Sequence, residues 1–281
     1  MNAYRLTAGQ IAAYSAYLRQ EERAEGTIEK YLRDLAAFTS WLGENAVTRE
    51  APVQWKNHLL SLRYAPVTIN SMLAALNGFF QFAGWHDCRV KFLKIQRRLF
   101  RDRSRELTRP EYERLISTAR GRKQERLALL IESMGATGIR VSEVRYLTVE
   151  AARRGWAEIS LKGKIRTILL PNKLCRKLLK YARKQQTASG EIFLTKSGRS
   201  LTRCQIWAEM KRLCAHAGVE PGKVFPHNLR HLFATAFYRA CKDIVRLADV
   251  LGHSSIETTR IYLVTSGAEH SRQLNQLKLV L

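Results

Sequence analysis

The first hundred residues contain one apolar pattern twice, with an offset of 41 residues between the copies. The pattern consists of Thr27, Ile28, Leu32, Leu35, Phe38, Trp41 and Gly43, repeated as Thr68, Ile69, Leu73, Leu76, Phe79, Phe82 and Gly84. Its apolar positions lie three or four residues apart, which is typical of one face of an amphipathic helix, and each threonine stands where an N-cap is expected. The repeat therefore predicts two similar helices with their aromatic residues in a common core.

Two further helical stretches, LTAGQIAAYSAYLRQEERA and PVQWKNHLLSL, precede the repeat and separate its copies. Together they predict a four-helix bundle over residues 1–95. Residues 96–107 are densely basic without apolar periodicity, and we interpret them as an interdomain linker. A helix start at Thr108, Pro110 and Glu111 then opens a second domain, residues 108–281. The expected fold class is mainly α, with two domains and a small β-hairpin in the second.

The charge of the chain indicates its class of partner. It has 281 residues with 48 Lys+Arg against 24 Asp+Glu, a formal net charge of +24 and a pI of about 10.3. Such an excess attracts polyanions, and 46% hydrophobic residues are too many for a disordered basic tail. We therefore expect a folded protein that binds double-stranded DNA, with two basic domains and a basic linker that form a clamp around the duplex.

Four cations on the polar side of the bundle are candidates for phosphate contacts, although a solvated surface is the commoner role for any one of them. They are Lys30, Arg33, Lys56 and Arg63.

Location and cofactors are limited by what the sequence lacks. The segment MNAYRLTAGQ does not resemble a signal peptide, and no run approaches the ~20 apolar residues that span a bilayer, so we expect a cytoplasmic protein without membrane partners. The five cysteines have neither CxxC nor zinc-site spacing, which favours reduced, structural thiols. A GxxxxGK[ST] loop is also missing. We expect no metal, no cofactor and no nucleotide hydrolysis.

The stretch RLALLIESMGATGIRVSEVRYL contains a joint between two predicted helices. Gly138 is expected to end the first helix and Ser142 to cap the second. Arg140 lies in the joint, where its guanidinium can bind two phosphate oxygens, and Glu143 can orient nearby groups from the same turn. A single arginine at such a place is more often a cap or a surface ion pair.

Two further motifs carry candidate catalytic residues. WAEISLKGKIRTILLP has two alternating runs around a short turn, which predicts a β-hairpin with Lys162 and Lys164 at its tip. PHNLRHLFATAFYRA has His227 and Arg230 three residues apart, on one side of the first turn of a helix. His231 is expected to face elsewhere and to be structural.

The segment LGHSSIETTRIYLV begins like a helix start. Ser254 with Glu257 fits a capping box, which predicts a helix from near Ser255 that carries Tyr262 about two turns on. His253 stands just before this helix, nine residues from the tyrosine. A half-buried helix aromatic is the ordinary role of a tyrosine at such a position.

These motifs together resemble the tyrosine recombinase (phage integrase) family. The resemblance rests on GIRVSE, the hairpin lysine, HNLRH, LGHS and a tyrosine nine residues after the last histidine, in this order. GTIEKYLRDLAAF and TINSMLAALNGFFQF resemble the amino-terminal core-binding domain of the family, so the likeness covers nearly the whole chain.

The resemblance implies that Tyr262 is the nucleophile and that Arg140 and Arg230 bind the non-bridging oxygens of the scissile phosphate. Attack on a phosphodiester builds negative charge on these oxygens, which fixed arginines stabilise. A phenol, with a pKa of ~10, needs cationic and basic neighbours to become a useful nucleophile. A tyrosyl ester stores the bond energy, so the strand can be rejoined without ATP or metal.

For the remaining site residues the resemblance implies supporting roles. His227 assists proton transfer, His253 hydrogen-bonds the phosphate and Lys162 protonates the leaving 5′ oxygen, while Glu143 supports the site. The turn after Lys162 is about one residue shorter than the resemblance predicts. Lys164 is therefore a competitor for the role of proton donor.

Three interpretations follow, of which a site-specific recombinase is the first. A type IB topoisomerase shares the tyrosine chemistry, and a DNA-binding protein with an inactive catalytic domain belongs to a different class. In the tail, Leu274, Leu277 and Leu281 have helical spacing and predict an amphipathic helix. This helix docks either on its own domain or on a neighbouring protomer, and the resemblance favours the neighbour, in a tetramer on paired DNA sites.

Overall fold

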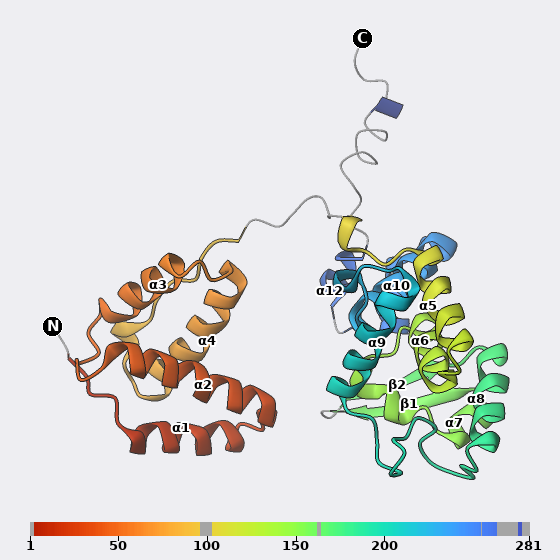
Figure 1. Ribbon diagram of the computed structural model, residues 1–281. Coiled ribbons are helices and arrows are strands. Elements are labelled where there is room, and N and C mark those ends of the chain that lie inside the picture. Colours follow the sequence, from red (N-terminus) through yellow and green to blue (C-terminus); the bar gives the residue numbers. More distant parts are fainter. Residues whose placement is uncertain (1–2, 96–102, 162–163, 254, 263–274, 277–281) are drawn as a thin grey trace. The chain divides into compact units, whose positions relative to one another are not determined.

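The computed structural model describes residues 3–95, 103–161, 164–253, 255–262 and 275–276 (Figure 1). The chain divides into two units, Met1–Arg97 and Arg98–Leu281. The described residues are mostly helical and contain one two-stranded antiparallel sheet, which confirms the predicted fold class. None of the described helices is both long and apolar enough to cross a membrane.

The first unit is the predicted four-helix bundle. Its helices are α1 (Ala8–Gln20), α2 (Glu25–Leu42), α3 (Ala51–Ser61) and α4 (Pro66–Phe82), followed by the 3-10 helix η1 (His86–Cys88). The two helices of the repeat, α2 and α4, pack against each other. Leu35, Phe38, Leu76 and Phe79, which are equivalent positions in the two copies, are fully buried in one core.

The repeated threonines do not cap these helices, so that expectation is wrong. The N-caps are Ala24 and Ala65, and Thr27 and Thr68 are each the third residue inside their helix. Both helices begin earlier because a proline opens α4, where its fixed φ suits the first turn, and a glutamate opens α2, where its charge complements the helix dipole.

The second unit has helices on both sides of α6, which packs against α5, α8 and α10. Its longer elements are α5 (Arg109–Gly121), α6 (Glu125–Thr137), α7 (Val149–Arg154), β1 (Trp156–Leu161), β2 (Lys164–Leu169), α8 (Asn172–Lys184), α9 (Arg203–Ala217), α10 (Pro226–Cys241), α11 (Ile244–Leu251) and α12 (Ile256–Arg260). Short 3-10 helices are η2 (Arg103–Arg105), η3 (Val141–Tyr146) and η4 (Pro221–Lys223).

The start of α5 agrees with its sequence signal. The Thr108 hydroxyl accepts the Glu111 N–H, and the Glu111 carboxylate accepts the Thr108 N–H at 2.8 Å, which forms a capping box. Upstream of this box, Leu107 is buried and the Asn228 amide donates to the Arg105 carbonyl at 2.7 Å. The last residues of the stretch that we interpreted as linker therefore pack on the second unit.

The predicted hairpin is present as strands β1 and β2, paired from Trp156 with Leu169 to Leu161 with Lys164. Its inward face buries Ala157, Ile159 and Ile168. The proposed tail residues Leu274, Leu277 and Leu281 lie outside the described residues, as does Lys162.

Candidate active site

Arg140 lies in the joint between α6 and η3. Gly138 is the C-cap of α6, with a left-handed φ of 64°, and a Cβ on this glycine would lie 2.5 Å from Phe233 Cδ1. The predicted Ser142 cap is wrong, because η3 begins at Val141 and Ser142 lies inside it. The Arg140 N–H is bound instead by the Glu143 carboxylate, at 2.8 Å.

Glu143 is a buried carboxylate that holds two arginines. It accepts the Arg140 backbone N–H and Arg140 Nη1, the latter at 2.9 Å, and forms an ion pair with Arg166 Nη2. Burial raises the pKa of the Glu143 carboxyl, but these hydrogen bonds and the charge of Arg166 outweigh burial and lower the pKa below its ordinary value. The carboxylate is therefore charged, and 40% of the Arg140 side chain remains exposed beside it.

Arg166 is a site residue that the sequence analysis missed. It points inward from β2, with its side chain 14% exposed, and donates to Glu143 and to the Leu251 carbonyl at the end of α11. Its Nε is buried without a hydrogen-bond partner in the described part of the chain. Strand alternation was the available signal, since Arg166 lies two residues before the buried Ile168 and on the same face.

Arg230 is fixed by the backbone around it. It is 3% exposed and donates to the Gly138 carbonyl at 2.6 Å, the Leu251 carbonyl at 2.7 Å and His253 Nε2 at 2.9 Å. Burial and the nearby charge of Arg140 lower the pKa of Arg230 to about 10, so it stays cationic at neutral pH. The nearby Tyr262 side chain acts against these effects and raises the pKa of Arg230.

The contacts of His253 define its tautomer. Because arginine has only N–H donors, His253 Nε2 accepts from Arg230, and the other ring nitrogen, Nδ1, donates to Thr259 Oγ1 at 2.9 Å. Burial and the charges of Arg230, Arg140 and Arg166 lower the pKa of His253 to about 4. The ring is therefore neutral at physiological pH and offers its basic nitrogen to the arginine.

The segment around Tyr262 differs from the prediction. Ser255 caps α12, with its Oγ accepting the Glu257 N–H at 3.3 Å, and Ser254 of the predicted capping box lies outside the described residues. The helix ends at Arg260, so Tyr262 follows it in a turn and donates its backbone N–H to the Thr259 carbonyl at 3.0 Å. Closely spaced β-branched residues weaken a helix here.

Tyr262 is buried among three imidazole rings. Ring centroids lie 5.1 Å away for His231, 5.9 Å for His253 and 6.3 Å for His227, and the His253 ring is nearly parallel to the tyrosine at 13°. The expectation that His231 faces elsewhere is therefore wrong. It follows His227 by four residues, a spacing that puts both on one helix face, and the sequence analysis considered only the spacing of three.

The described residues do not distinguish between the two hairpin lysines as the proton donor. Lys162 lies outside the described residues, and Lys164 is described only by its backbone, which pairs with Leu161 at the end of β1. Which lysine donates the proton therefore stays a prediction.

The four candidate cations of the first unit have different surroundings. Lys30 pairs with the buried Asp34, and Arg33 Nε lies 3.8 Å from the same carboxylate. Lys56 donates to the Lys91 carbonyl at 3.3 Å, and Arg63 is exposed. The part of the chain that is described contains no cluster of three or more His, Cys, Asp or Glu side chains that could hold a metal ion.

Five elements, η3, β2, α10, α11 and the turn after α12, bring Tyr262 next to the His253 ring, which accepts a hydrogen bond from the rigid Arg230. A second arginine, Arg140, is partly exposed, and three imidazole rings surround the tyrosine ring. This set of groups can bind an anionic phosphodiester and supply an oxygen nucleophile.

Comparison with known proteins agrees with this arrangement. Residues 105–268 match the Phage integrase family, and residues 11–87 match its N-terminal SAM-like domain. The chain therefore belongs to the phage integrase family, a class of DNA strand-transferring enzymes.

Several relatives in this family match over most of the chain. Tyrosine recombinase XerA of Thermococcus kodakarensis is 29% identical over 276 residues, which cover 95% of this chain and 94% of the relative. Tyrosine recombinase XerD of Xanthomonas campestris pv. campestris is 30% identical and covers 86% of this chain and 83% of its own. These relatives support site-specific recombination, and neither of the alternative interpretations receives support.

Solved structures share the fold at low sequence identity. The Tn1549 transposon integrase in complex with transposon right end DNA has a TM-score of 0.71 at 17% identity, covering 96% of this chain and 99% of that one. A lambda integrase tetramer bound to a Holliday junction has a TM-score of 0.73, also at 17% identity, covering 90% and 76%.

Proposed function

We propose that this enzyme is a site-specific recombinase that cuts a DNA strand by attack of the Tyr262 hydroxyl on a phosphodiester. The attack forms a 3′-phosphotyrosyl ester and releases a 5′ hydroxyl, and attack by another 5′ hydroxyl on the ester rejoins the strands. The observation that carries the proposal is the buried Tyr262 ring stacked near His253, whose Nε2 accepts from Arg230, an arginine that two backbone carbonyls hold in place.

Phosphate binding is assigned to Arg140 and Arg230. Arg140 uses one guanidinium nitrogen for Glu143 and is 40% exposed, so its other N–H groups can reach a ligand. Arg230 gives an N–H group to His253, and a phosphate oxygen beside the tyrosine competes for it. Because both arginines are anchored before the substrate binds, they stabilise the charge of the transition state with little reorganisation.

Proton transfer from the tyrosine is assigned to the imidazoles. His227 lies on the exposed side of the first turn of α10, with its ring near Tyr262, and is the proposed assistant in proton transfer. His253 is the proposed hydrogen-bond partner of the phosphate. In the present arrangement its Nε2 accepts from Arg230, so donation to a phosphate requires a proton on that nitrogen, which the negative charge of the ligand favours.

The first test is covalent trapping on nicked duplexes made from DNA that flanks the gene. We expect wild type to form a DNA-linked band on denaturing gels and Tyr262→Phe to bind without forming one. Tyr238→Phe, a loss of the same hydroxyl from α10, is the matched control and should keep the band. A band that persists in Tyr262→Phe would show that another residue is the nucleophile.

The same assay can separate Lys162 from Lys164 as the donor to the leaving 5′ oxygen. A substrate with sulfur in place of that oxygen has a leaving group that needs no proton, since a thiol is far more acidic than an alcohol. Alanine at the donor lysine should abolish cleavage of ordinary DNA and leave cleavage of the sulfur substrate intact. If both lysine variants cleave both substrates equally, neither is the donor.

We also propose that the enzyme works as a tetramer on two paired duplexes, with support from the lambda integrase tetramer among its structural neighbours. Deletion of residues 271–281 should weaken assembly on DNA more than binding to a single site. Equal losses in the two assays would argue that the tail serves its own domain.

A further inference from the structure

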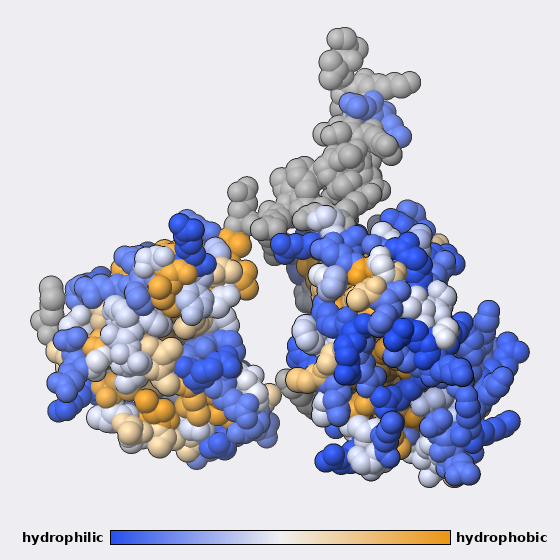
Figure 2. All heavy atoms as spheres, in the orientation of Figure 1, coloured by the Kyte–Doolittle hydropathy of each residue, from blue (hydrophilic) through white to orange (hydrophobic). Residues whose placement is uncertain are grey.

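Helix α8 carries a row of cations on its solvent face. The helix has six Lys and Arg residues, and at 3.6 residues per turn all six lie within about a third of its circumference. They are Lys173, Arg176, Lys177, Lys180, Arg183 and Lys184. The opposite face buries Leu174, Leu178 and Tyr181 in the core, and Figure 2 shows the hydrophilic surface on this side of the unit.

The six cations are not equivalent. Lys177 pairs with Glu132 and Lys184 pairs with Glu125, so two carboxylates of α6 neutralise one edge of the row. The other four, Lys173, Arg176, Lys180 and Arg183, are exposed and form no ion pair with any described residue. The row therefore keeps a surplus of positive charge on the side away from α6.

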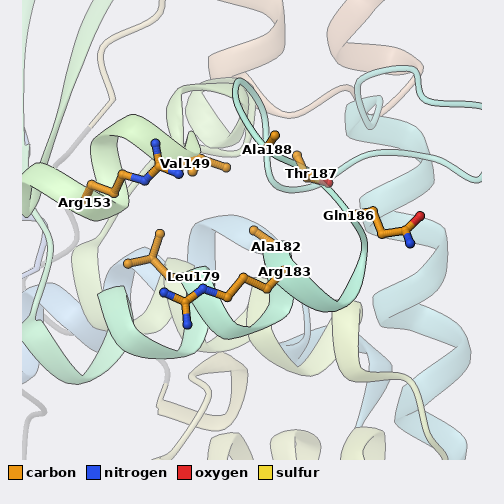
Figure 3. Close-up of a pocket in the computed structure, with 8 residues that line it drawn as sticks. All are labelled: Val149, Arg153, Leu179, Ala182, Arg183, Gln186, Thr187 and Ala188. Atoms are coloured by element: carbon orange, nitrogen blue, oxygen red, sulfur yellow. The ribbon is translucent and has the colours of Figure 1, made fainter.

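A pocket of about 270 Å³ lies next to this surplus, between α7 and α8 (Figure 3). Val149, Leu179 and Ala182 contribute its apolar lining, while Arg153 from α7 and Arg183 from α8 contribute guanidinium groups. The Glu150 carboxylate accepts the Gly190 N–H at 3.1 Å and is also attracted by the charge of Arg153.

This surface is separate from the candidate active site. None of the active-site residues described above lies on α7 or α8, and α6 packs against α8 as well as against α10, which carries Arg230. The cations of α8 therefore belong to a different element from every group assigned to the reaction at Tyr262.

We propose that the surface formed by α7 and α8 binds the backbone of a second DNA segment, other than the one at Tyr262. The proposal rests on the function proposed above. The ten residue steps from Lys173 to Arg183 rise about 15 Å along the helix, which matches about four base-pair steps of duplex. Cations beside a small apolar pocket suit a backbone of charged phosphates and apolar sugars, and such contacts carry no sequence information.

Duplex DNA fits this surface better than an acidic protein does. Protein interfaces have a buried apolar centre with aromatic anchors, whereas here the apolar part is one small pocket between arginines. A second, sequence-independent DNA contact would hold flanking or partner DNA near the enzyme and raise its local concentration.

The chain offers a matched pair of variants for a test. Arg176→Gln with Lys180→Gln removes two unpaired cations, and Lys177→Gln with Lys184→Gln removes two cations that are paired with carboxylates, from the same helix. Each protein is titrated with a random-sequence duplex of about 15 base pairs, one and a half helical turns. The number of duplexes bound at saturation is measured by sedimentation velocity over a range of salt concentrations.

We expect two duplexes per chain for wild type and for the paired-cation variant, and weakened binding of one of them in the unpaired-cation variant. Loss of two phosphate contacts should reduce the slope of log K against log salt concentration for that binding step by about 1.8. Between 50 and 200 mM salt, the affinity of this step then falls about tenfold less than in wild type. Equal stoichiometry and slope in all three proteins would overturn the proposal. Equal loss in both variants would also overturn it, since net charge would then explain the effect.

Two further outcomes are decisive. If polyglutamate occupies the second site more tightly than the duplex does, the partner is an acidic protein and the proposal is wrong. Adduct formation on nicked DNA should be the same in the unpaired-cation variant as in wild type. If wild type itself forms no adduct, the proposed function fails, while the number of duplexes bound still tests the α8 surface.

Discussion

Replacing Glu143 by glutamine removes the charge that balances Arg166 and tethers Arg140. Arg166 would then be a cation, only 14% exposed, with its Nε already lacking a partner and its counterion gone. Breaking a buried ion pair on one side costs about 3–5 kcal/mol. At about 2–4 °C per kcal/mol for a domain of 150–250 residues, the second unit should melt roughly 6–20 °C lower.

A double-mutant cycle isolates the pair from other effects of the substitution. Arg166→Met leaves Glu143 buried with Arg140 as its remaining partner, and the double variant removes both charges together. Because the cost comes from an uncompensated buried charge, the double variant should lose at least about 1 kcal/mol less than the two single losses added.

Differential scanning calorimetry suits this measurement because the chain has two units. The first unit contains none of the substituted residues, so its transition should stay in place in every variant and acts as a control within the molecule. If the single losses add to within about 0.5 kcal/mol, the two side chains do not interact and the ion pair that we describe is wrong.

Two other predictions concern the end of α11. The pKa of His253 is about 4 in the folded protein against an ordinary 6.5, so the ring takes up a proton in the unfolded chain at a higher pH than in the folded one. The neutral ring's contribution to the free energy of unfolding is therefore complete above pH 6.5 and is lost as pH falls from 6.5 to 4. Urea midpoints at about pH 7.5 and about pH 5 should therefore differ less in His253→Gln than in wild type, and an unchanged difference would contradict this. Gly252→Ala should destabilise the second unit by about 1–3 kcal/mol, because φ is +63° and the new Cβ would lie 2.4 Å from Arg166 Cδ; a thermal midpoint equal to that of wild type would refute the contact.

Periodicity was sufficient to predict the larger elements. The apolar repeat identified α2 and α4, and the alternating runs identified β1 and β2, because packing against a core depends on spacing more than on the identity of each residue. The helix start near Ser255 was also predicted, but the end of this helix before Tyr262 was not. Helix α12 has five residues, and tertiary packing of Tyr262 against Leu247 and Leu251 decides where the chain leaves it.

The contacts between distant residues were beyond sequence reasoning. Arg166 stands 23 residues after Glu143, and the sequence shows it only as one residue of an alternating strand. A charged residue at an inward position of a strand does indicate a buried partner of opposite charge, but it does not identify that partner. His231 was visible as a neighbour of His227 on the helix, yet its approach to the Tyr262 ring depends on how the turn after α12 folds back on α10.

The Leu251 carbonyl connects these observations. The last carbonyl groups of a helix have no hydrogen-bond donors within the helix. At the end of α11, the side chains of Arg166 and Arg230 both donate to the Leu251 carbonyl. Gly252 then turns the chain with a positive φ, so that His253 reaches Arg230. The same carbonyl therefore fixes Arg230, which we propose binds phosphate, and, through Arg166, strand β2. A substitution of Arg166 should therefore also change the surroundings of Tyr262, although the two residues belong to different elements.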